Sequence, residues 1–330
     1  MALETIRVLI YIDNEALEDG KERGTDQMRW LVKEKTKHFI NVEMEILNRH
    51  GGGHFANPIT ESLLRNYDEL WVFGYEQVDV PLKEKPRNEL TKEEVDTLRR
   101  WMDAGNGVLV SGDHSELDPR GGPTTPDTFL GLGMAIGSKI PRAGQLRVWV
   151  GPPTSRVDMA LSFSSLEGST LGHLSIRPEL QEDHIPQHLT LIRDPVAHEL
   201  FWWDIDETGT PTPILKLPDH MHEGRVQIPE SLNGEWPDPE VKPKIVARGT
   251  DKRNNKPYDL IAVYDGHRCG VGRIVADSSW HHYANVNLKG FPRNECGLPY
   301  KGSDFDQITQ YYVNLVLWLA PASLMRPPLP

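Results

Sequence analysis

The chain has 330 residues, a formal net charge of −12 and only two cysteines. Proteins that bind nucleic acid or anionic membranes need basic patches, so this charge argues against both kinds of partner. Two cysteines are too few for a disulfide framework, although one bridge between Cys269 and Cys296 stays open. At this length roughly three-quarters of the unfolded surface can be buried, so folding requires neither a disulfide nor a metal.

The first element is an apolar run over residues 6–12 (IRVLIYI), which predicts a buried strand that ends before Asp13. Because this run is too short for a membrane span or a signal core, we expect a cytoplasmic protein. A helix is predicted over residues 25–38. Residues 42–46 alternate apolar and acidic side chains, which is typical of a strand with one exposed face.

A short helix over residues 60–65 and a buried strand over residues 69–73 follow, and the strand ends close to Glu76. The start of the next helix is well marked, because Thr91 and Glu94 have the spacing of a capping box. Apolar side chains then recur at helical spacing as far as position 102.

Residues 105–115 (GNGVLVSGDHS) contain two glycines that end this helix, a short apolar strand, and a polar turn with Asp113 and His114. In open α/β sheets, ligands bind just beyond the carboxyl ends of parallel strands. His114 and Asp113 are therefore the leading candidates for acid–base catalysis, since imidazole can take or give a proton near neutral pH. Alternatively, both residues cap the helix that follows.

The middle of the chain, about residues 118–257, is rich in proline and glycine and has only short apolar stretches. We interpret it as a loop-rich, partly antiparallel insertion that covers the strand tips of one α/β domain spanning residues 1–330. A separate second domain is the alternative, but no clear linker marks its borders.

Regular alternation returns with strands over residues 260–264 and 273–276 and a last helix over residues 305–319. On its buried side this helix carries the following side chains: Ile308, Tyr311, Tyr312, Leu315 and Leu319. Strands that alternate with helices in this way predict a doubly wound, mostly parallel sheet with helices on both faces.

A second polar turn follows the last of these strands, where Asp277, Ser278, His281 and His282 lie close together in sequence. A late strand of a doubly wound sheet can lie beside the central strand, which would bring these side chains near His114. Asp277 and one histidine are candidates for catalysis, and Ser278 for binding substrate. Adjacent histidines point apart, so at most one of them enters the site directly.

A possible metal site is suggested by His220, His222 and Glu223, since a His-x-His spacing on an extended segment turns both imidazoles to one side. A divalent metal such as zinc would be the cofactor. Such a short motif is also common in polar surface loops, and the surrounding prolines favour that alternative.

Three further residues are candidates for substrate binding. Asp13 and Glu76 follow predicted strands, and Arg248 could clamp an anionic group. The two carboxylates are at least as well explained as helix caps or solvated turn residues, and a single arginine is weak evidence for such a clamp. Walker, dinucleotide-binding and Gly-x-Ser-x-Gly patterns in their required contexts do not occur.

Two sequence blocks carry a family resemblance. The first reads L-T-x-E-x-V-x-x-L and then A-G-x-G-V-L-V-x-G-D-H-S, and the second is G-R-I-V-A-D-S-S-W-H-H followed by the last helix. Together they resemble the ThuA-like branch of the class I glutamine amidotransferase-like superfamily, over roughly the first 115 and last 75 residues. The resemblance implies a flavodoxin-like sheet with a site at the strand tips.

The resemblance also implies where this chain departs from true amidotransferases, which place a nucleophilic cysteine in the turn after the central strand. That turn here carries Asp113 and His114, while Cys269 and Cys296 lie elsewhere. We therefore do not expect glutaminase activity.

The sequence thus predicts an enzyme that acts on a small polar molecule by His/Asp acid–base chemistry or by metal-assisted hydrolysis. The resemblance implies that this molecule is derived from carbohydrate. A homo-oligomer is compatible with the sequence. The alternative is a non-catalytic binding or assembly module that retained the fold without the nucleophile.

Overall fold

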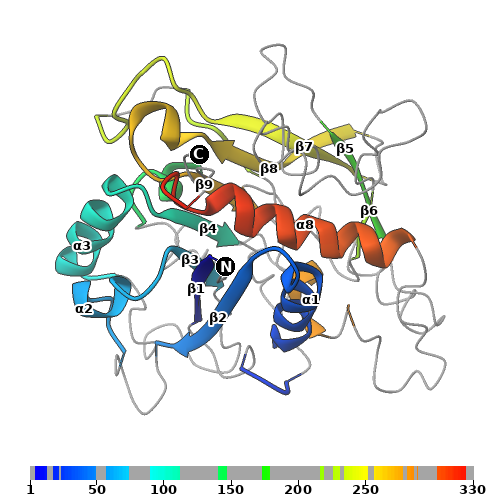
Figure 1. Ribbon diagram of the computed structural model, residues 1–330. Coiled ribbons are helices and arrows are strands. Elements are labelled where there is room, and N and C mark those ends of the chain that lie inside the picture. The colour runs from blue at the N-terminus through cyan, green and yellow to red at the C-terminus, as the bar shows by residue number, and fades with distance from the viewer. Residues whose placement is uncertain are drawn as a thin grey trace, which may run out of the picture.

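The computed structural model contains a nine-stranded sheet in the order β2-β1-β3-β4-β9-β8-β7-β5-β6 (Figure 1). The structure describes residues 4–12, 18–21, 24–49, 57–73, 90–111, 140–146, 173–178, 216–218, 226–230, 234–251, 256–277, 281–285, 288 and 303–324. Among these, no helix is both long enough and apolar enough to cross a bilayer.

Five strands are parallel to one another and form the part of the sheet that the sequence predicts. They are β1 (Thr5–Ile12), β2 (Asn41–Asn48), β3 (Glu69–Phe73), β4 (Gly107–Ser111) and β9 (Ile274–Asp277). In chain order their arrangement is 2-1-3-4-5, which is the flavodoxin-like order of doubly wound sheets. The predicted α/β fold class is therefore confirmed.

The remaining four strands extend the sheet beyond β9 and pair in antiparallel fashion. They are β8 (Lys256–Tyr264), β7 (Lys244–Asp251), β5 (His173–Pro178) and β6 (Lys216–Pro218). Three of them come from the predicted insertion, which agrees with its expected antiparallel character.

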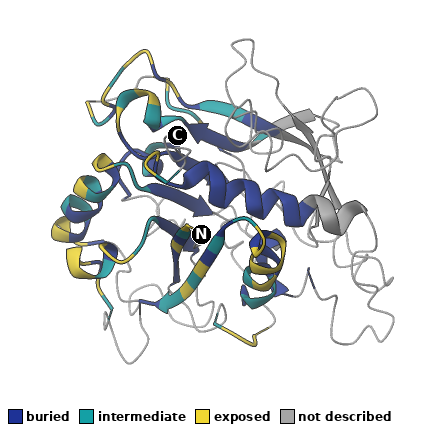
Figure 2. Cartoon of the chain, viewed as in Figure 1, coloured by how far each residue is buried: buried dark blue, intermediate teal, exposed yellow. Residues whose placement is uncertain are grey.

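Helices cover both faces of the parallel strands (Figure 1). One face packs against α1 (Asp26–Thr36) and α8 (Ser303–Leu319), and the other against α2 (Glu61–Leu64) and α3 (Lys92–Asp103). Two apolar cores result, one on each side of the sheet, because alternate residues of a strand point to opposite faces. Figure 2 shows the central strands and most of α8 as buried.

Burial of α8 is more complete than its sequence pattern predicts. Every residue from Ile308 to Ala320 is buried, and not only the side that faces the sheet. The cause is its position, because α8 crosses the sheet while α1 and β6 contact it as well. A helix that is buried all round needs partners for its polar side chains, since an unsatisfied buried polar group is costly.

The turn from α3 into β4 follows the predicted plan. Thr91 and Glu94 form a complete capping box, and Gly105 ends the helix with a positive φ of 102°. At Gly107 the constraint is steric, because a Cβ atom there would lie 2.2 Å from the carbonyl oxygen of Leu319. The two glycines therefore allow β4 to start directly beneath the end of α8.

Candidate functional site

The carboxyl ends of β4 and β9 lie side by side. Their last residues, Ser111 and Asp277, are paired in the parallel register, and both are buried. The expectation that the late strand adjoins the central one is therefore confirmed. In a doubly wound sheet this edge is where ligands bind, so Asp277 is the natural starting point for a site.

Three side chains donate hydrogen bonds to one oxygen of Asp277. Its Oδ2 atom accepts from the Tyr283 hydroxyl at 2.8 Å and from the Tyr311 hydroxyl at 2.6 Å. It also lies 2.9 Å from Nε2 of His282. Asp277 and His282 have no exposed surface. The three donors therefore satisfy this buried oxygen, as a buried polar atom requires.

His282 belongs to a short 3₁₀ helix (His281–Tyr283) that directly follows the strand end. Since the carboxylate of Asp277 is an acceptor, Nε2 of His282 carries the proton that it shares with Oδ2. The other ring nitrogen, Nδ1, is buried and has no hydrogen-bond partner. A proton on Nδ1 would thus leave a buried donor unsatisfied. The hydrogen bonds therefore favour the tautomer that has its proton on Nε2 and its lone pair on Nδ1.

The tyrosine hydroxyls act as permanent donors. Burial raises the pKa of Tyr283 and of Tyr311 well above the usual range, and the negative charge of Asp277 raises both further. Both phenols therefore stay protonated. Tyr312 adds a second contact from α8, because its hydroxyl donates to the backbone carbonyl of His282.

Aromatic packing fixes the imidazole in place. The ring of His282 lies 4.3 Å from that of Tyr283 and 5.6 Å from that of Tyr311, measured between centroids. Phe73, the last residue of β3, packs on Tyr283 at 5.0 Å. Strands β3 and β9 and helix α8 thus hold one histidine in a single orientation.

Of the residues predicted for catalysis, the structure brings Asp277 and His282 into direct contact. His281 lies in the same 3₁₀ helix, and the structure does not describe its side chain. Arg248 lies on β7, paired with Asp259 of β8. Because Ile261 of β8 is the partner of Asp277, position 248 lies toward the same edge of the sheet.

Several other predicted residues lie outside the described part of the chain, so the structure does not test them. They are Asp13, Glu76, Asp113, His114, His220, His222, Glu223 and Ser278. Within the described ranges, no group of three or more histidine, cysteine or carboxylate side chains could hold a metal ion. The predicted zinc site therefore remains a prediction.

Sequence reasoning missed the hydroxyl groups of Tyr283 and Tyr311. The helical pattern places Tyr311 and Tyr312 on the buried side of the last helix, but it uses only their apolar rings. A signal was nevertheless present, because a buried tyrosine hydroxyl usually finds a hydrogen-bond partner. A polar acceptor, such as the strand-end Asp277, was therefore to be expected beneath that helix.

Neither a protein-family model nor a curated protein matches this chain. Solved structures with a related arrangement include a protein from Parabacteroides merdae named as ThuA-like, with 11% identity over 97% of this chain and 92% of that chain and a TM-score of 0.43. A ThuA-like protein from Bacteroides uniformis has 11% identity over 97% and 93% and a TM-score of 0.38.

A third similar structure is the mmIFT52 N-terminal domain, with 12% identity over 94% of this chain and 97% of that chain and a TM-score of 0.40. Two of these three proteins carry the family name that the sequence motifs suggest. At such low scores the likeness does not place the chain in a family, and its flavodoxin-like α/β fold rests on its own strand order.

Proposed function

We propose that this protein is an enzyme that acts on a small polar molecule, with His282 as its acid–base group and Asp277 as the residue that positions it. The supporting observation is the pair itself. Asp277 accepts the Nε2 proton of His282, while Nδ1 stays buried without a partner. A base held by a carboxylate, with its second nitrogen free, is the arrangement that activates hydroxyl groups and water in many enzymes.

The chemistry follows from the two ring nitrogens. Because His282 has no exposed surface, the proposal requires that the substrate or a water molecule enters the space beside Nδ1. Nδ1 then takes a proton from it, and the imidazolium that forms is stabilised by the carboxylate through the Nε2 hydrogen bond. If water is the proton donor, the reaction is a hydrolysis. His282 then returns the proton to the leaving group.

Residues from the neighbouring strand end complete the proposed site. Asp113 and His114 follow β4, whose last residue is paired with Asp277, and we propose that they supply the second acid–base pair. In the same proposal Ser278, Glu76 and Arg248 bind the polar groups of a substrate, which the sequence resemblance suggests is derived from carbohydrate.

A metal-assisted version would route water activation through a divalent ion on His220, His222 and Glu223. Acid–base chemistry is the preferred version because the contact between Asp277 and His282 is observed, whereas the three candidate metal ligands lie outside the described ranges. Metal analysis of the purified protein, together with activity after treatment with a chelator, separates the two.

The test begins with a panel of sugars, sugar acids and their esters and glycosides, assayed for binding by thermal shift and for turnover by product analysis. For a compound that is turned over, His282→Gln should lower kcat by about 100-fold or more while leaving binding within a few fold. The matched control is His38→Gln, at an exposed position after α1, which should behave like wild type.

Two outcomes would overturn the proposal. Turnover that persists in the folded His282→Gln protein would remove His282 from the chemistry. Compounds that bind the wild type but are never converted would instead favour the non-catalytic binding module. Circular dichroism and a cooperative unfolding transition establish that the variant is folded.

A further inference from the structure

Strand β2 forms one end of the nine-stranded sheet, and no described strand pairs with its outer side. The backbone N–H groups of Asn41 and Arg49, at and just beyond its two ends, bond to the strand β1 side. Because N–H and C=O groups alternate direction along a strand, residues 42, 44 and 46 present theirs outward. We call the outer side of residues 41–48 the β2 edge. It is a row of backbone groups able to pair with another strand.

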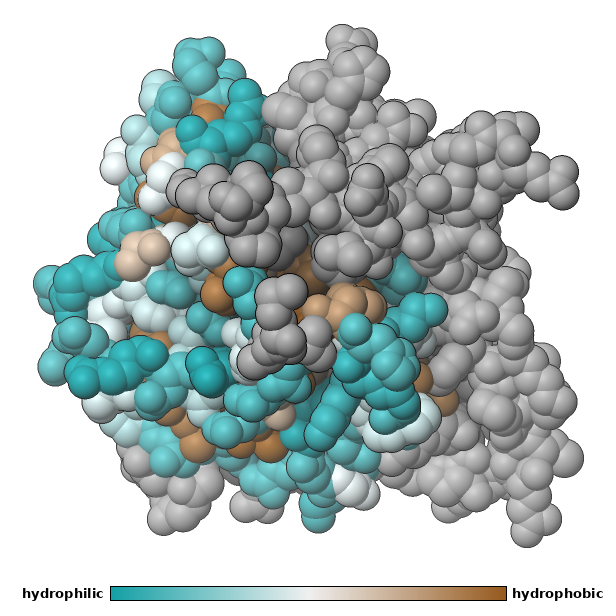
Figure 3. Space-filling model, in the orientation of Figure 1, coloured by the Kyte–Doolittle hydropathy of each residue, from teal (hydrophilic) through white to brown (hydrophobic). Residues whose placement is uncertain are grey.

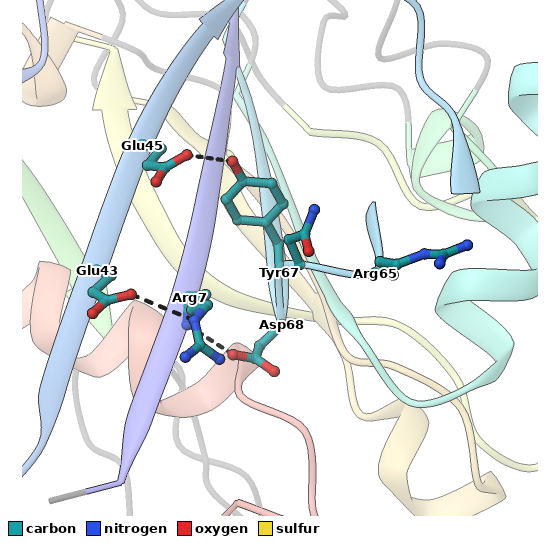
Figure 4. A pocket seen from close by; sticks show the side chains of 7 residues that line it. Arg7, Glu43, Glu45, Arg65, Tyr67 and Asp68 are labelled. Atoms are coloured by element: carbon teal, nitrogen blue, oxygen red, sulfur yellow. Dashed lines mark hydrogen bonds and ion pairs between the residues drawn. The ribbon is translucent and has the colours of Figure 1, made fainter. Parts of the chain in front are cut away.

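The surface is hollowed on both sides of the β2 edge. On one face a depression of about 540 Å³ is lined by Arg7, Glu43, Glu45, Arg65, Asn66, Tyr67 and Asp68. Figure 4 shows Glu43 and Glu45 on the same face of β2, directed toward Arg7 and Tyr67. The depression exists because α2 has only four residues and leaves the starts of β1 and β2 uncovered.

The other face carries a second depression, of about 450 Å³, between β2 and α1. It is lined by Val42, Met44 and Trp30 together with six polar or charged residues: Asp26, Arg29, Lys33, Asn41, Glu43 and Glu45. Trp30 is 54% exposed and is the one large hydrophobic side chain recorded as exposed among the described residues. Figure 3 shows that apolar residues elsewhere on the visible described surface are scattered in small groups.

The two faces thus differ in chemistry. Glu43 and Glu45 are exposed carboxylates on one side, and the side chain of Glu43 is 54% accessible despite its ion pair with Arg7. On the other side the half-buried Met44 and the exposed Trp30 offer apolar contacts beside the charged side chains of α1. A strand that pairs with the β2 edge would meet acids on one face and apolar groups on the other.

A second copy of β2 does not fit this pattern. Antiparallel pairing of two copies about Met44 would place Glu43 of one copy opposite Glu45 of the other, and like charges directly opposite each other are destabilising. The net charge of −12 adds a general repulsion between copies. The same two carboxylates would attract lysine or arginine side chains on a different partner.

One side chain already hydrogen-bonds to the outer side of the β2 edge. Arg29 of α1 donates from Nη1 to the outward carbonyl of Met44 at 3.3 Å, while its Nη2 pairs with Asp19. A hydrogen bond of this length is weak, so an incoming strand can displace it and leave Arg29 with Asp19. The carbonyl of Met44 is then available for pairing.

We propose that the β2 edge binds an extended segment of a partner protein that carries basic side chains on one face and apolar side chains on the other. The segment adds a tenth strand to the sheet. Backbone hydrogen bonds supply affinity, and the alternation of Glu43 and Glu45 with Met44 supplies specificity. This inference is independent of the acid–base site, which lies at the ends of β4 and β9.

The test uses fluorescein-labelled heptapeptides of alternating lysine and valine, with alternating glutamate and valine as the charge-reversed control. Fluorescence anisotropy should show that the lysine peptide binds the full-length protein and the glutamate peptide does not. Met44→Pro removes an outward N–H without breaking the pairing with β1, and should weaken binding by about tenfold, for a lost bond and a steric obstacle.

Two further variants test the proposal even if Met44→Pro does not fold. Glu43→Lys combined with Glu45→Lys should reverse the preference, so that the glutamate peptide binds and the lysine peptide does not. Arg29→Ala should strengthen binding of the lysine peptide, because it unblocks the Met44 carbonyl. Two results would overturn the proposal. One is that the lysine peptide still binds the Glu43→Lys/Glu45→Lys double variant, and the other is that it does not bind the wild-type protein.

Sedimentation of the unliganded protein adds a last outcome. A dimer that becomes monomeric in Met44→Pro would mean that a second copy of this chain occupies the edge, which would also overturn the assignment of a basic partner.

Discussion

Tyr311 donates its hydroxyl proton to Oδ2 of Asp277 over 2.6 Å, and this is the same oxygen that accepts the Nε2 proton of His282. The last helix of the chain is therefore joined to the end of the last parallel strand by a buried polar contact. Because Tyr311 and His282 share one oxygen, loss of the phenol leaves more negative charge for the imidazole.

Tyr311→Phe tests this coupling. The variant keeps the ring but removes one donor from a buried carboxylate, which should cost about 1–3 kcal/mol in the free energy of unfolding. Urea denaturation measures that cost. In the same protein, the NMR signals of the His282 imidazole should shift relative to wild type, because one donor to the oxygen that it shares with Tyr311 is gone.

Tyr67→Phe is the matched control for the stability measurement. The Tyr67 hydroxyl donates to Glu45 at the half-exposed surface, where water can replace the lost partner. Its removal should therefore change stability by less than about 1 kcal/mol. Equal losses of unfolding free energy in the two variants would show that the Tyr311 hydrogen bond contributes no more to stability than a bond at the surface.

Much of the parallel sheet could be predicted because its strands are short apolar runs bounded by glycine or polar residues. The strand over residues 69–73 was predicted with its observed ends, and the predicted capping box of Thr91 and Glu94 is complete. Such signals are local, since they depend on neighbours three or four positions away. Strand β8 starts four residues earlier than predicted, because Lys256–Asp259 lacks an apolar pattern but pairs with β7.

The candidate site was predictable only in part. Asp277 and His282 stood out because they follow a strand end, and the adjacency of β4 and β9 follows from the doubly wound order. The convergence of Tyr283 and Tyr311 on one oxygen depends on how α8 crosses the sheet, over a separation of 34 residues between Asp277 and Tyr311. The spacing of apolar residues in the sequence does not indicate where α8 crosses the sheet.

Glu94 provides a test at acidic pH. Its carboxylate forms a buried pair with Arg49, with bonds of 2.5 and 3.0 Å, and accepts the backbone N–H groups of Ile59 and Thr91. Burial alone would raise the pKa of Glu94, but the hydrogen bonds from Arg49 and the two backbone groups outweigh it and lower the pKa to about 2.

Since the folded-state pKa of Glu94 is below its value of 4.5 in the unfolded chain, the pair stabilises the protein fully above that pH. The stabilisation is lost as pH falls from about 4.5 to about 2. Glu94→Gln should cost about 3–5 kcal/mol at pH 7, because it leaves the buried Arg49 without its partner. The cost should shrink in urea denaturation at pH 3, and a cost independent of pH would contradict this account.

Glu69 should show the opposite pH dependence. It lies at the start of β3 with no exposed surface. Oε2 accepts the indole N–H of Trp71 at 2.9 Å, while Oε1 has no partner. Burial raises the pKa of Glu69 well above its usual value of 4.5, so the carboxyl is neutral in the folded protein at moderately acidic pH.

Because the unfolded chain ionises Glu69 at lower pH than the folded protein does, this residue costs stability as pH rises above about 4.5. The cost grows by about 1.4 kcal/mol per pH unit until the folded-state pKa is reached. Glu69→Gln keeps an acceptor for Trp71 and cannot ionise. Its stability relative to wild type should therefore increase between pH 5 and pH 8, as measured by urea denaturation, and a constant difference would show that Glu69 is already ionised in the fold.

Gly107 tests the contact between the central strand and the last helix. A Cβ atom at this position would lie 2.2 Å from the carbonyl oxygen of Leu319 and 2.8 Å from its Cβ atom. Gly107→Ala must therefore push the end of α8 away from β4, at a cost of about 1–3 kcal/mol or more.

Gly234→Ala is the control, because a Cβ atom there meets nothing within 4 Å and its φ is not positive. If thermal unfolding shows equal stability for the two variants, α8 does not press on β4 as closely as the structure indicates. A selective loss in Gly107→Ala, accompanied by altered shifts of Tyr311 and His282 in NMR spectra, would show that the seating of α8 on the sheet also positions the polar cluster at its far edge.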